Sequence, residues 1–201
     1  MALRLRQKEP LSVQSLIESL RQYNPQADVQ PIQEAYDFSA KAHAGQKRES
    51  GEPFLQHPLQ TAQIIVDLKL DVPSIVAGLL HDTIEDTETT YDELVSHFGL
   101  EVADIVMDVT DEKKGSVGER KQRQVDHAAS TSGKARLVKL ADKIADLRKM
   151  ASSPPTSWDI RRTQEYFDRA AHVVDQIRGT HPALEALFDA AAKVKPNTQL
   201  R

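Results

Sequence analysis

The chain has 201 residues, of which 39% are hydrophobic and 28% charged, with a formal net charge of −4 and no cysteine. This length predicts one domain with a substantial core. The absence of cysteine excludes disulfides, a thiol nucleophile and a thiolate zinc site, so any metal must be held by nitrogen and oxygen. No apolar segment has the length of a membrane span, and the first ten residues, MALRLRQKEP, lack the hydrophobic region of a secretory signal. We therefore expect a cytoplasmic protein.

The charge is unevenly distributed along the chain. The segment 110–150 carries eleven Lys or Arg against six Asp or Glu, which leaves the rest of the chain acidic. A basic segment on an acidic protein can attract an anionic small molecule without making the surface a nucleic-acid binder. A solvated helix face explains any single lysine there equally well.

In chain order, almost every periodic segment predicts an α-helix. The first is expected at 11–23, and the second at 31–43, where Pro31 suits a first helical turn. Gly45, Gly51 and Pro53 then interrupt regular structure and predict a loop up to residue 57. Pro58 opens a helix through about residue 68, and a further helix runs from residue 72 to His81 and Asp82.

The second half of the chain continues the pattern, without strand alternation or an internal repeat. Further helices are expected at 91–98, 102–109, 117–129, 134–150, 158–177 and 182–194. The sequence thus predicts an all-α fold, a compact multi-helix bundle. We expect an N-terminal helical extension over 1–30, the main domain over 31–194 and a frayed tail over 195–201.

The most informative charges are His81 and Asp82, which end an apolar stretch and precede Glu85 and Asp86. Burying such groups costs free energy unless something binds their charges. If the helix continues through His81, residues four apart share a face, so His81 aligns with Glu85 and Asp82 with Asp86. A helix C-terminus repels carboxylates, so a positive group should compensate, and a divalent metal would do so. A C-terminal histidine with a capping acid is the alternative.

Two distant residues are further candidate ligands. His57 precedes Pro58, whose ring restricts the preceding backbone to extended conformations and so limits the directions of the imidazole. An ordinary surface histidine is the alternative. Asp142 lies beside the apolar face of its helix, where an unpaired carboxylate is costly. A salt bridge to Lys139 or Lys143 would explain it equally well.

The order His57, His81-Asp82 and Asp142, with spacings of 24 and 60, resembles the HD-domain phosphohydrolases. The segments AYDFSAKAHAGQKRESGEPFLQHP, AGLLHDTIEDT and ARLVKLADKIADLRKM resemble the hydrolase domain of the RelA/SpoT family of alarmone enzymes. The resemblance runs from about Tyr23 to Gly179, and the chain ends where that domain should end. It implies an HD-domain bundle that acts as a stand-alone small alarmone hydrolase of the Mesh type.

The resemblance also implies a cofactor and a reaction. The metal would be Mn²⁺, and its ligands would be His57, His81, Asp82 and Asp142. Two nitrogens and two carboxylates suit such an ion. Glu85 and Asp86 match the catalytic acids of the family, which would orient or deprotonate the attacking water. The reaction would be hydrolysis at the 3′-pyrophosphate of ppGpp or pppGpp, giving pyrophosphate and GDP or GTP.

Substrate contacts follow less directly from the resemblance. Arg48 matches an arginine that packs on the guanine base, and a planar guanidinium suits that stacking. Lys47 could meet phosphate or be merely exposed. Lys139, Arg162 and Tyr166 match positions near the nucleotide. For each of these residues, a solvated salt bridge or ordinary packing is an equally good explanation.

Two positions depart from the pattern of the family. Asp146 stands where an asparagine near the ribose is usual, and Glu49 follows Arg48 where lysine is common. An ionised carboxylate only accepts hydrogen bonds and adds negative charge beside a polyphosphate. Binding of the guanosine alarmone could therefore weaken or shift to another nucleotide, and Asp146→Asn is expected to tighten it.

Two other functions stay open at this point. The chain could be an HD phosphohydrolase of another phosphorylated ribonucleotide, such as ppApp or the 2′-phosphate of NADPH. It could also be a nucleotide-binding regulator without turnover, although the complete set of candidate ligands argues against this. A small-molecule nucleotide is the expected partner, and neither nucleic acid nor membrane is. The oligomeric state cannot be read from the sequence.

Overall fold

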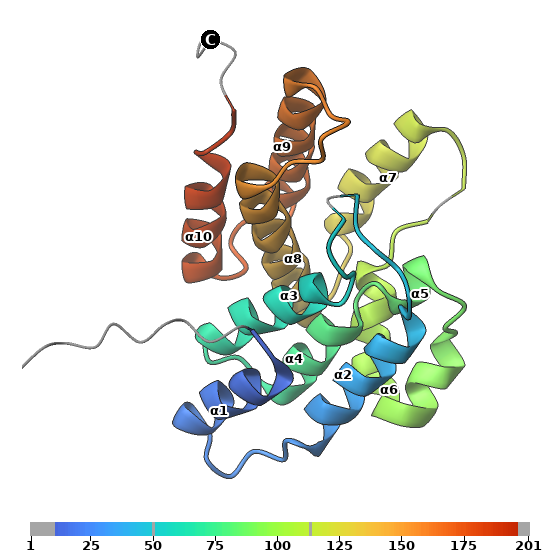
Figure 1. The fold of residues 1–201 in the computed structure, drawn as a ribbon, viewed down its shortest axis with the longest axis vertical. Helices are drawn as coiled ribbons and strands as arrows, with labels where there is room; N and C mark the ends of the chain where they lie inside the picture. The colour runs from blue at the N-terminus through green and yellow to red at the C-terminus, as the bar shows by residue number, and fades with distance from the viewer. Residues whose placement is uncertain (1–10, 50, 113, 197–201) are drawn as a thin grey trace, which may run out of the picture.

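The computed structural model describes residues 11–49, 51–112 and 114–196. Across these ranges the fold is all-α, as predicted, and strand-like pairing is confined to an isolated bridge between Lys47 and Pro53. Figure 1 labels the helices: α1 (Val13–Tyr23), α2 (Gln30–Ala42), α3 (Gln56–Asp67), α4 (Val72–Leu80), α5 (Thr83–Asp86), α6 (Tyr91–Val109), α7 (Val117–Ala128), α8 (Gly133–Ser152), α9 (Ile160–Asp175) and α10 (Pro182–Ala192).

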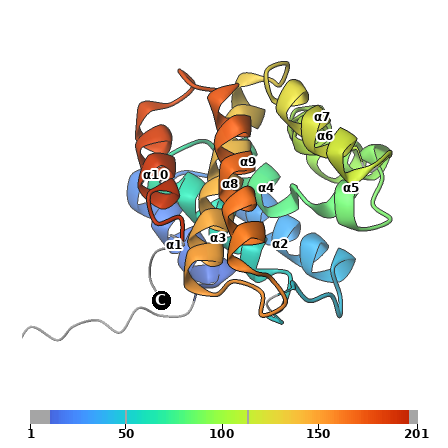
Figure 2. The ribbon, with the colours of Figure 1, turned by 90° about the horizontal axis from the view of Figure 1, so that it is seen from above.

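Helix α4 is the centre of the bundle. Asp71 caps its N-terminus by accepting a hydrogen bond from the backbone N–H of Ser74, and every residue from Ser74 to Leu80 is buried. A helix that is apolar all round must be covered on all sides, and α2, α3, α6 and α8 pack against it. Figure 2 shows α5, α6 and α7 on one side of α8 and α10 on the other.

Helices α3 and α4 approach each other closely at Gly78. A Cβ atom at this position would lie 2.7 Å from Cδ1 of Ile65 and 3.4 Å from the Cα of Ala62. The first contact is shorter than van der Waals distance and the second is ordinary, so alanine at position 78 would require the Ile65 side chain to shift. This close approach lies one turn before His81.

Helix α1 packs on the core. Its apolar face buries Val13, Leu16 and Leu20 against α2 and α3, in the same hydrophobic cluster as α4 and α8. The domain boundary expected at residue 30 stays a prediction. Residues 1–10 of the expected extension and residues 197–201 of the expected tail lie outside the described residues.

The sequence placed most helices to within a few residues, and the exceptions concern the site. Helix α3 begins at Gln56, so His57 lies inside the helix rather than before it. Helix α4 ends at Leu80, and a separate short helix carries Glu85 and Asp86. The two helices expected at 91–98 and 102–109 are both present, and they are joined as α6 across a kink at Gly99, where φ is +82° and the backbone is not helical. No helix in the described ranges has both the length and the apolar character of a membrane span.

Candidate metal and phosphate site

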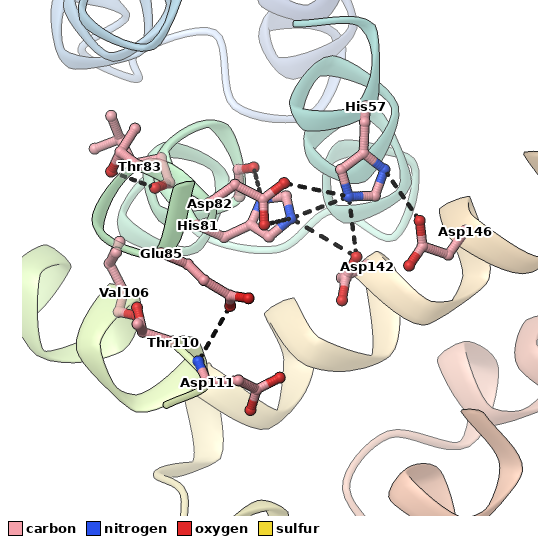
Figure 3. Close-up of polar contacts among 12 residues, drawn as sticks. His57, His81, Asp82, Thr83, Glu85, Val106, Thr110, Asp111, Asp142 and Asp146 are labelled. Carbon is pink, nitrogen blue, oxygen red and sulfur yellow. Dashed lines mark hydrogen bonds and ion pairs between the residues drawn. The ribbon is translucent and has the colours of Figure 1, made fainter. Parts of the chain in front are cut away.

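Three helices bring His57, His81 and Asp142 together. The Nε2 atoms of the two imidazoles lie 3.1 Å apart, and Oδ1 of Asp142 lies 3.0 Å from Nε2 of His57 and 3.7 Å from that of His81. Both histidines are buried, with exposed fractions of 4% and 5%. Figure 3 shows the three side chains pointing toward one point from α3, the end of α4 and α8. All three donor atoms lie within 4.8 Å of one another.

His57 reaches this point from the first turn of α3. Its helical backbone corrects the expectation of an extended conformation before Pro58. Pro58 is the third residue of the helix, in the first turn, where a missing N–H leaves no intrahelical bond unmade. The restriction that proline places on its predecessor is a preference, and helix packing overrides it here.

Asp82 joins the cluster from the turn between α4 and α5. Its carboxylate lies 3.3 Å from Nε2 of His81 and 3.7 Å from Nε2 of His57. The sequence argument had assumed that the helix continues through this pair, but α4 ends at Leu80, whose carbonyl accepts a hydrogen bond from the Thr83 hydroxyl at 2.6 Å. Asp82 thus stands beside the three donors above, and its role as a ligand stays a prediction.

The chemistry of this donor set fits a divalent cation. The Nδ1 atom of His81 lies 2.9 Å from the carbonyl of Gly78, which can only accept, so Nδ1 carries the hydrogen and Nε2 faces the cluster. Burial lowers the pKa of His81, but the carboxylates of Asp82 and Asp142 outweigh it and raise that pKa to about 9. Two nitrogens and nearby carboxylate oxygens that together stabilise a positive charge are the donors that cations such as Zn²⁺ or Mn²⁺ take.

Asp142 is held ionised. Burial alone would raise its pKa, but Lys143, at 2.9 Å, and the two histidines lower it well below the usual range. Lys143 is one of the two partners that the salt-bridge explanation had named. Burial alone would lower the pKa of Lys143, but the carboxylate of Asp142 outweighs this effect and raises that pKa well above the usual value. The ion pair and the histidine cluster therefore coexist, because each oxygen of Asp142 faces one of them.

Glu85 lies beside the cluster on α5, and its neighbour Asp111 was not expected from the sequence. The backbone N–H of Asp111 donates to Oε2 of Glu85 at 3.1 Å, as Figure 3 shows. Burial is the main cause that raises the pKa of Glu85 to about 7. The side chain of Asp111 pairs with the buried amino group of Lys139 at 3.2 Å. Glu85 can therefore exchange a proton near neutral pH.

Asp146 connects the cluster to two further side chains. Arg48 donates from Nη2 to Oδ1 of Asp146 at 2.7 Å, and the Tyr166 hydroxyl donates to Oδ2. The same Oδ1 lies 3.7 Å from Nδ1 of His57. The carboxylate that departs from the pattern of the family is therefore neutralised by Arg48 rather than left as a free charge.

A cavity of about 510 Å³ opens above these groups. Lys47 and Asp86 line it, together with the residues of the cluster, Arg48, Glu85, Lys139, Asp146 and Tyr166. Arg162 does not line it: its guanidinium lies over the Trp158 ring at 4.2 Å, with Glu49 at 3.9 Å. Eleven of the twelve candidate residues therefore line the cavity, and Arg162 instead packs on Trp158.

Sequence reasoning missed several residues of this wall. They are Phe54, Asp111, Gln124, Lys143, Lys149, Met150 and Trp158. One signal was available for α8, because Lys139, Asp142, Lys143, Asp146 and Lys149 recur every three or four residues and so share a helix face. Asp111 and Gln124 lie in charged, aperiodic stretches that gave no such signal.

Comparison with known proteins gives consistent matches. A family model described as HD domain matches residues 35–172. The guanosine-3′,5′-bis(diphosphate) 3′-pyrophosphohydrolase MESH1 of Xenopus tropicalis is 44% identical over 167 residues, covering 81% of this chain and 93% of that protein. The human MESH1 is 44% identical over 156 residues, covering 76% and 87%. A solved structure of a metazoan ortholog of SpoT that hydrolyses ppGpp matches with a TM-score of 0.79 at 34% identity, covering 83% and 96%.

Proposed function

Because the chain belongs to the HD-domain family, and within it to the relatives of the MESH1 hydrolases, we propose that it hydrolyses the 3′-pyrophosphate of ppGpp or pppGpp with a divalent cation. The observation that carries this proposal is the cluster of His57, His81 and Asp142 at the base of a cavity. The cavity has the size of small-molecule sites. Its wall bears the cations Arg48 and Lys139, which suit an anionic nucleotide.

Mn²⁺ is the cation that we assign to this site. His57, His81, Asp82 and Asp142 would hold it, two nitrogens with two carboxylates, a set that borderline-hard divalent ions accept. When bound, such an ion lowers the pKa of a coordinated water and neutralises charge that develops on phosphorus. The carbonyl of Gly78 keeps Nε2 of His81 directed at the site, because it accepts the hydrogen of Nδ1.

Glu85 and Asp86 are the groups that we assign to proton transfer. The attacking water adds to the phosphorus bonded to the ribose 3′ oxygen, the P–O3′ bond breaks, and the 3′ oxygen takes a proton. Glu85 receives the proton of the water at Oε1, since Oε2 is held by the backbone of Asp111. A general base works best when its pKa lies near the working pH, and that of Glu85 is about 7. Asp86 lines the cavity next to it and orients the same water.

The cations of the wall are assigned to the substrate. Lys139 is held by Asp111 and Lys143 by Asp142, so both present a fixed charge to a phosphate. Arg48 is held by Asp146 and lies within 5.8 Å of the Phe54 ring, at a wall where a purine could stack on its planar group. Lys47, at the rim of the cavity, and Tyr166, beside Asp146, complete the proposed contacts.

A substrate panel tests the proposal. The purified chain is incubated with Mn²⁺ and, separately, with ppGpp, pppGpp, ppApp and NADPH, and the products are resolved by ion-exchange chromatography. Pyrophosphate together with GDP or GTP is the expected result. Orthophosphate from NADPH alone, or pyrophosphate from ppApp alone, would assign the chain to another phosphorylated ribonucleotide, and binding of ppGpp without turnover would make it a regulator.

A pair of variants at acidic residues tests the metal ligands, one at the site and one as its matched control. Asp82→Ala removes a proposed direct ligand. Because changes to residues that only support a ligand already cost up to about a hundredfold, this variant should lower kcat/KM at least about a hundredfold. Asp126→Ala removes an acid of equal charge from the exposed face of α7 and should leave turnover unchanged. Manganese content is measured by mass spectrometry of the dialysed proteins. Full activity and full metal content in the Asp82 variant would refute the ligand assignment.

A further inference from the structure

The turn that follows α2 folds Gln46 back over His43. The backbone N–H of Gln46 donates to the carbonyl of His43 at 3.0 Å, which closes a four-residue turn. Gly45 takes a φ of +77° within it, a conformation that residues with a Cβ rarely adopt. The glycine thus places the Gln46 side chain beside the imidazole at the end of α2.

The amide of Gln46 bonds to two partners in a fixed orientation. Its Nε2 donates to the backbone carbonyl of Asp86 at 3.1 Å. Because a carbonyl can only accept, the other end of the amide, Oε1, faces Nδ1 of His43 at 2.9 Å. Nδ1 must then carry the hydrogen, so the chain of donors runs from His43 through Gln46 to Asp86.

His43 is itself immobilised by its surroundings. Its exposed fraction is 4%, and its ring stacks on Phe54 with 4.3 Å between centroids and 16° between planes. Phe54 lines the cavity and belongs to the same loop as Gln46. A buried, stacked ring is a rigid anchor, so the direction of the Gln46 amide follows from the packing of the core.

The two ends of this chain belong to different parts of the site. Gln46 directly precedes Lys47 and Arg48, which line the cavity from the loop between α2 and α3. Asp86 is the last residue of α5, a helix of only four residues. A single turn makes few hydrogen bonds of its own and depends on outside contacts for its position.

We propose that Gln46 is a positioning residue that fixes α5, and with it Glu85 and Asp86, relative to the substrate-binding loop. His43 sets the orientation of Gln46. This inference rests on the proposed function, because Glu85 and Asp86 are the groups assigned to proton transfer there. A shift of α5 by a fraction of an ångström would misplace both carboxylates relative to the attacked phosphorus.

The loop keeps its shape without the Gln46 side chain. Its backbone is closed by the N–H of Phe54 donating to the carbonyl of Gln46 at 3.2 Å, and by the N–H of Arg48 donating to the carbonyl of Glu52 at 3.0 Å. Lys47 and Arg48 therefore stay in place when only the side chain at position 46 changes. The proposal consequently predicts a loss in kcat with little change in KM.

The test compares substitutions that break the chain of donors at one link each. Gln46→Leu, of similar size, should lower kcat for ppGpp about tenfold, the cost of one net hydrogen bond in the transition state, with KM changed less than about twofold. His43→Phe keeps the stack on Phe54 and removes the donor, so it should lower kcat in the same way. His43→Asn places an amide N–H where Nδ1 stood and should restore most of the rate.

Gln33→Leu is the matched control, since the Gln33 side chain donates to an exposed neighbour, Asp37, on the same helix. It should leave both constants unchanged. A raised KM with unchanged kcat in Gln46→Leu would show that Gln46 serves the loop alone and would overturn the proposal. Equal losses in all three site variants, without rescue by His43→Asn, would overturn the role of His43.

A second readout does not require turnover. Hydrogen exchange of the backbone amides of Asp86 and Thr87, which bond to Asp82 and Thr83, is measured by NMR in the protein without ligand. Gln46→Leu should speed their exchange about tenfold, while Gln33→Leu leaves it unchanged. Unchanged exchange would overturn the inference even in an active enzyme. A wild-type protein inactive on every nucleotide would instead overturn the proposed function and leave this readout valid.

Discussion

At the scale of single side chains, Asp146 shows how a structure changes the meaning of a substitution. From the sequence, its carboxylate is an added negative charge beside a polyphosphate. In the fold it is 8% exposed, accepts from Arg48 and Tyr166, and lies close to Nδ1 of His57. Its negative charge is therefore shared with a cation that faces the cavity, and removing it alters both the local charge and the support of two neighbours.

Asp146→Asn should consequently have two opposite effects. The free energy of unfolding should fall by about 1–3 kcal/mol, because Arg48 loses its ionised partner. Binding of ppGpp should tighten, since the site gains one net positive charge. Urea denaturation measures the first effect and isothermal titration calorimetry the second. The control is Asp126→Asn, which removes an equal charge on exposed α7; weaker binding in the Asp146 variant alone would mean that the placement of Arg48 matters more than its charge.

At the scale of elements, apolar periodicity and caps predicted the helices well. Ser12, Thr90 and Ser116 each open a helix with a capping box, and the expected segments begin within two residues of those starts. The errors have a physical pattern. Pro58 in the first turn of α3 and the polar pair after α4 were interpreted with local rules, whereas both backbones lie where α3 packs on α4. Local rules describe preferences that tertiary contacts can override.

The kink in α6 is an element whose cause can be tested. Gly99 has a φ of +82° and separates the half of the helix that begins at Tyr91 from the half that leads to Asp111. Space is available there for a methyl group, so strain arises from the backbone alone. Gly99→Ala should therefore lower the free energy of unfolding by about 1 kcal/mol.

The matched variant for this prediction is Gly118→Ala. Gly118 lies in the first turn of α7, also with open space around its Cα, but with ordinary helical φ. Alanine there should stabilise the protein by up to about 1 kcal/mol. Urea denaturation compares the two variants. A Gly99→Ala protein as stable as Gly118→Ala would show that the helix does not need the kink.

At the scale of the whole molecule, the candidate site is a product of tertiary structure. The order and spacing of His57, His81, Asp82 and Asp142 suggested a common site through resemblance, and the fold brings the four together from α3, the turn after α4, and α8. Sequence alone could not find Asp111 or Trp158, since their places on the cavity wall follow from how α6 and the segment before α9 cross the bundle. Nor could the sequence show that the Arg162 guanidinium packs on the Trp158 ring instead of lining the cavity.

Because the ligands come from separate helices, a bound cation should stabilise the entire fold, and pH should set how much. The raised pKa of His81 means that its proton stabilises the metal-free protein below pH 6.5, and that this contribution is lost as pH rises to about 9. Mn²⁺ needs the neutral imidazole, so its apparent affinity should rise about tenfold per pH unit in that range. The increase in Tm caused by Mn²⁺ should then grow by about 3 °C per pH unit.

Scanning calorimetry with and without Mn²⁺ across this pH range measures the effect. His57→Ala should abolish the Mn²⁺-dependent increase, whereas His172→Ala, on the exposed surface of α9, should retain it. An increase in Tm that is the same at every pH would mean that the cation displaces no proton from His81.

The close approach at Gly78 has a consequence for how the site evolves. Gly78 lies where α3 and α4 meet, and its carbonyl accepts the Nδ1 hydrogen of His81. The other imidazole, His57, belongs to α3, and its Nε2 lies 3.1 Å from that of His81. The distance between the two ring nitrogens therefore depends on how closely these helices pack around a residue three positions from one histidine and twenty-one from the other. A mutation that widened this helix pair should therefore weaken the proposed metal binding, because it would move the two imidazoles apart.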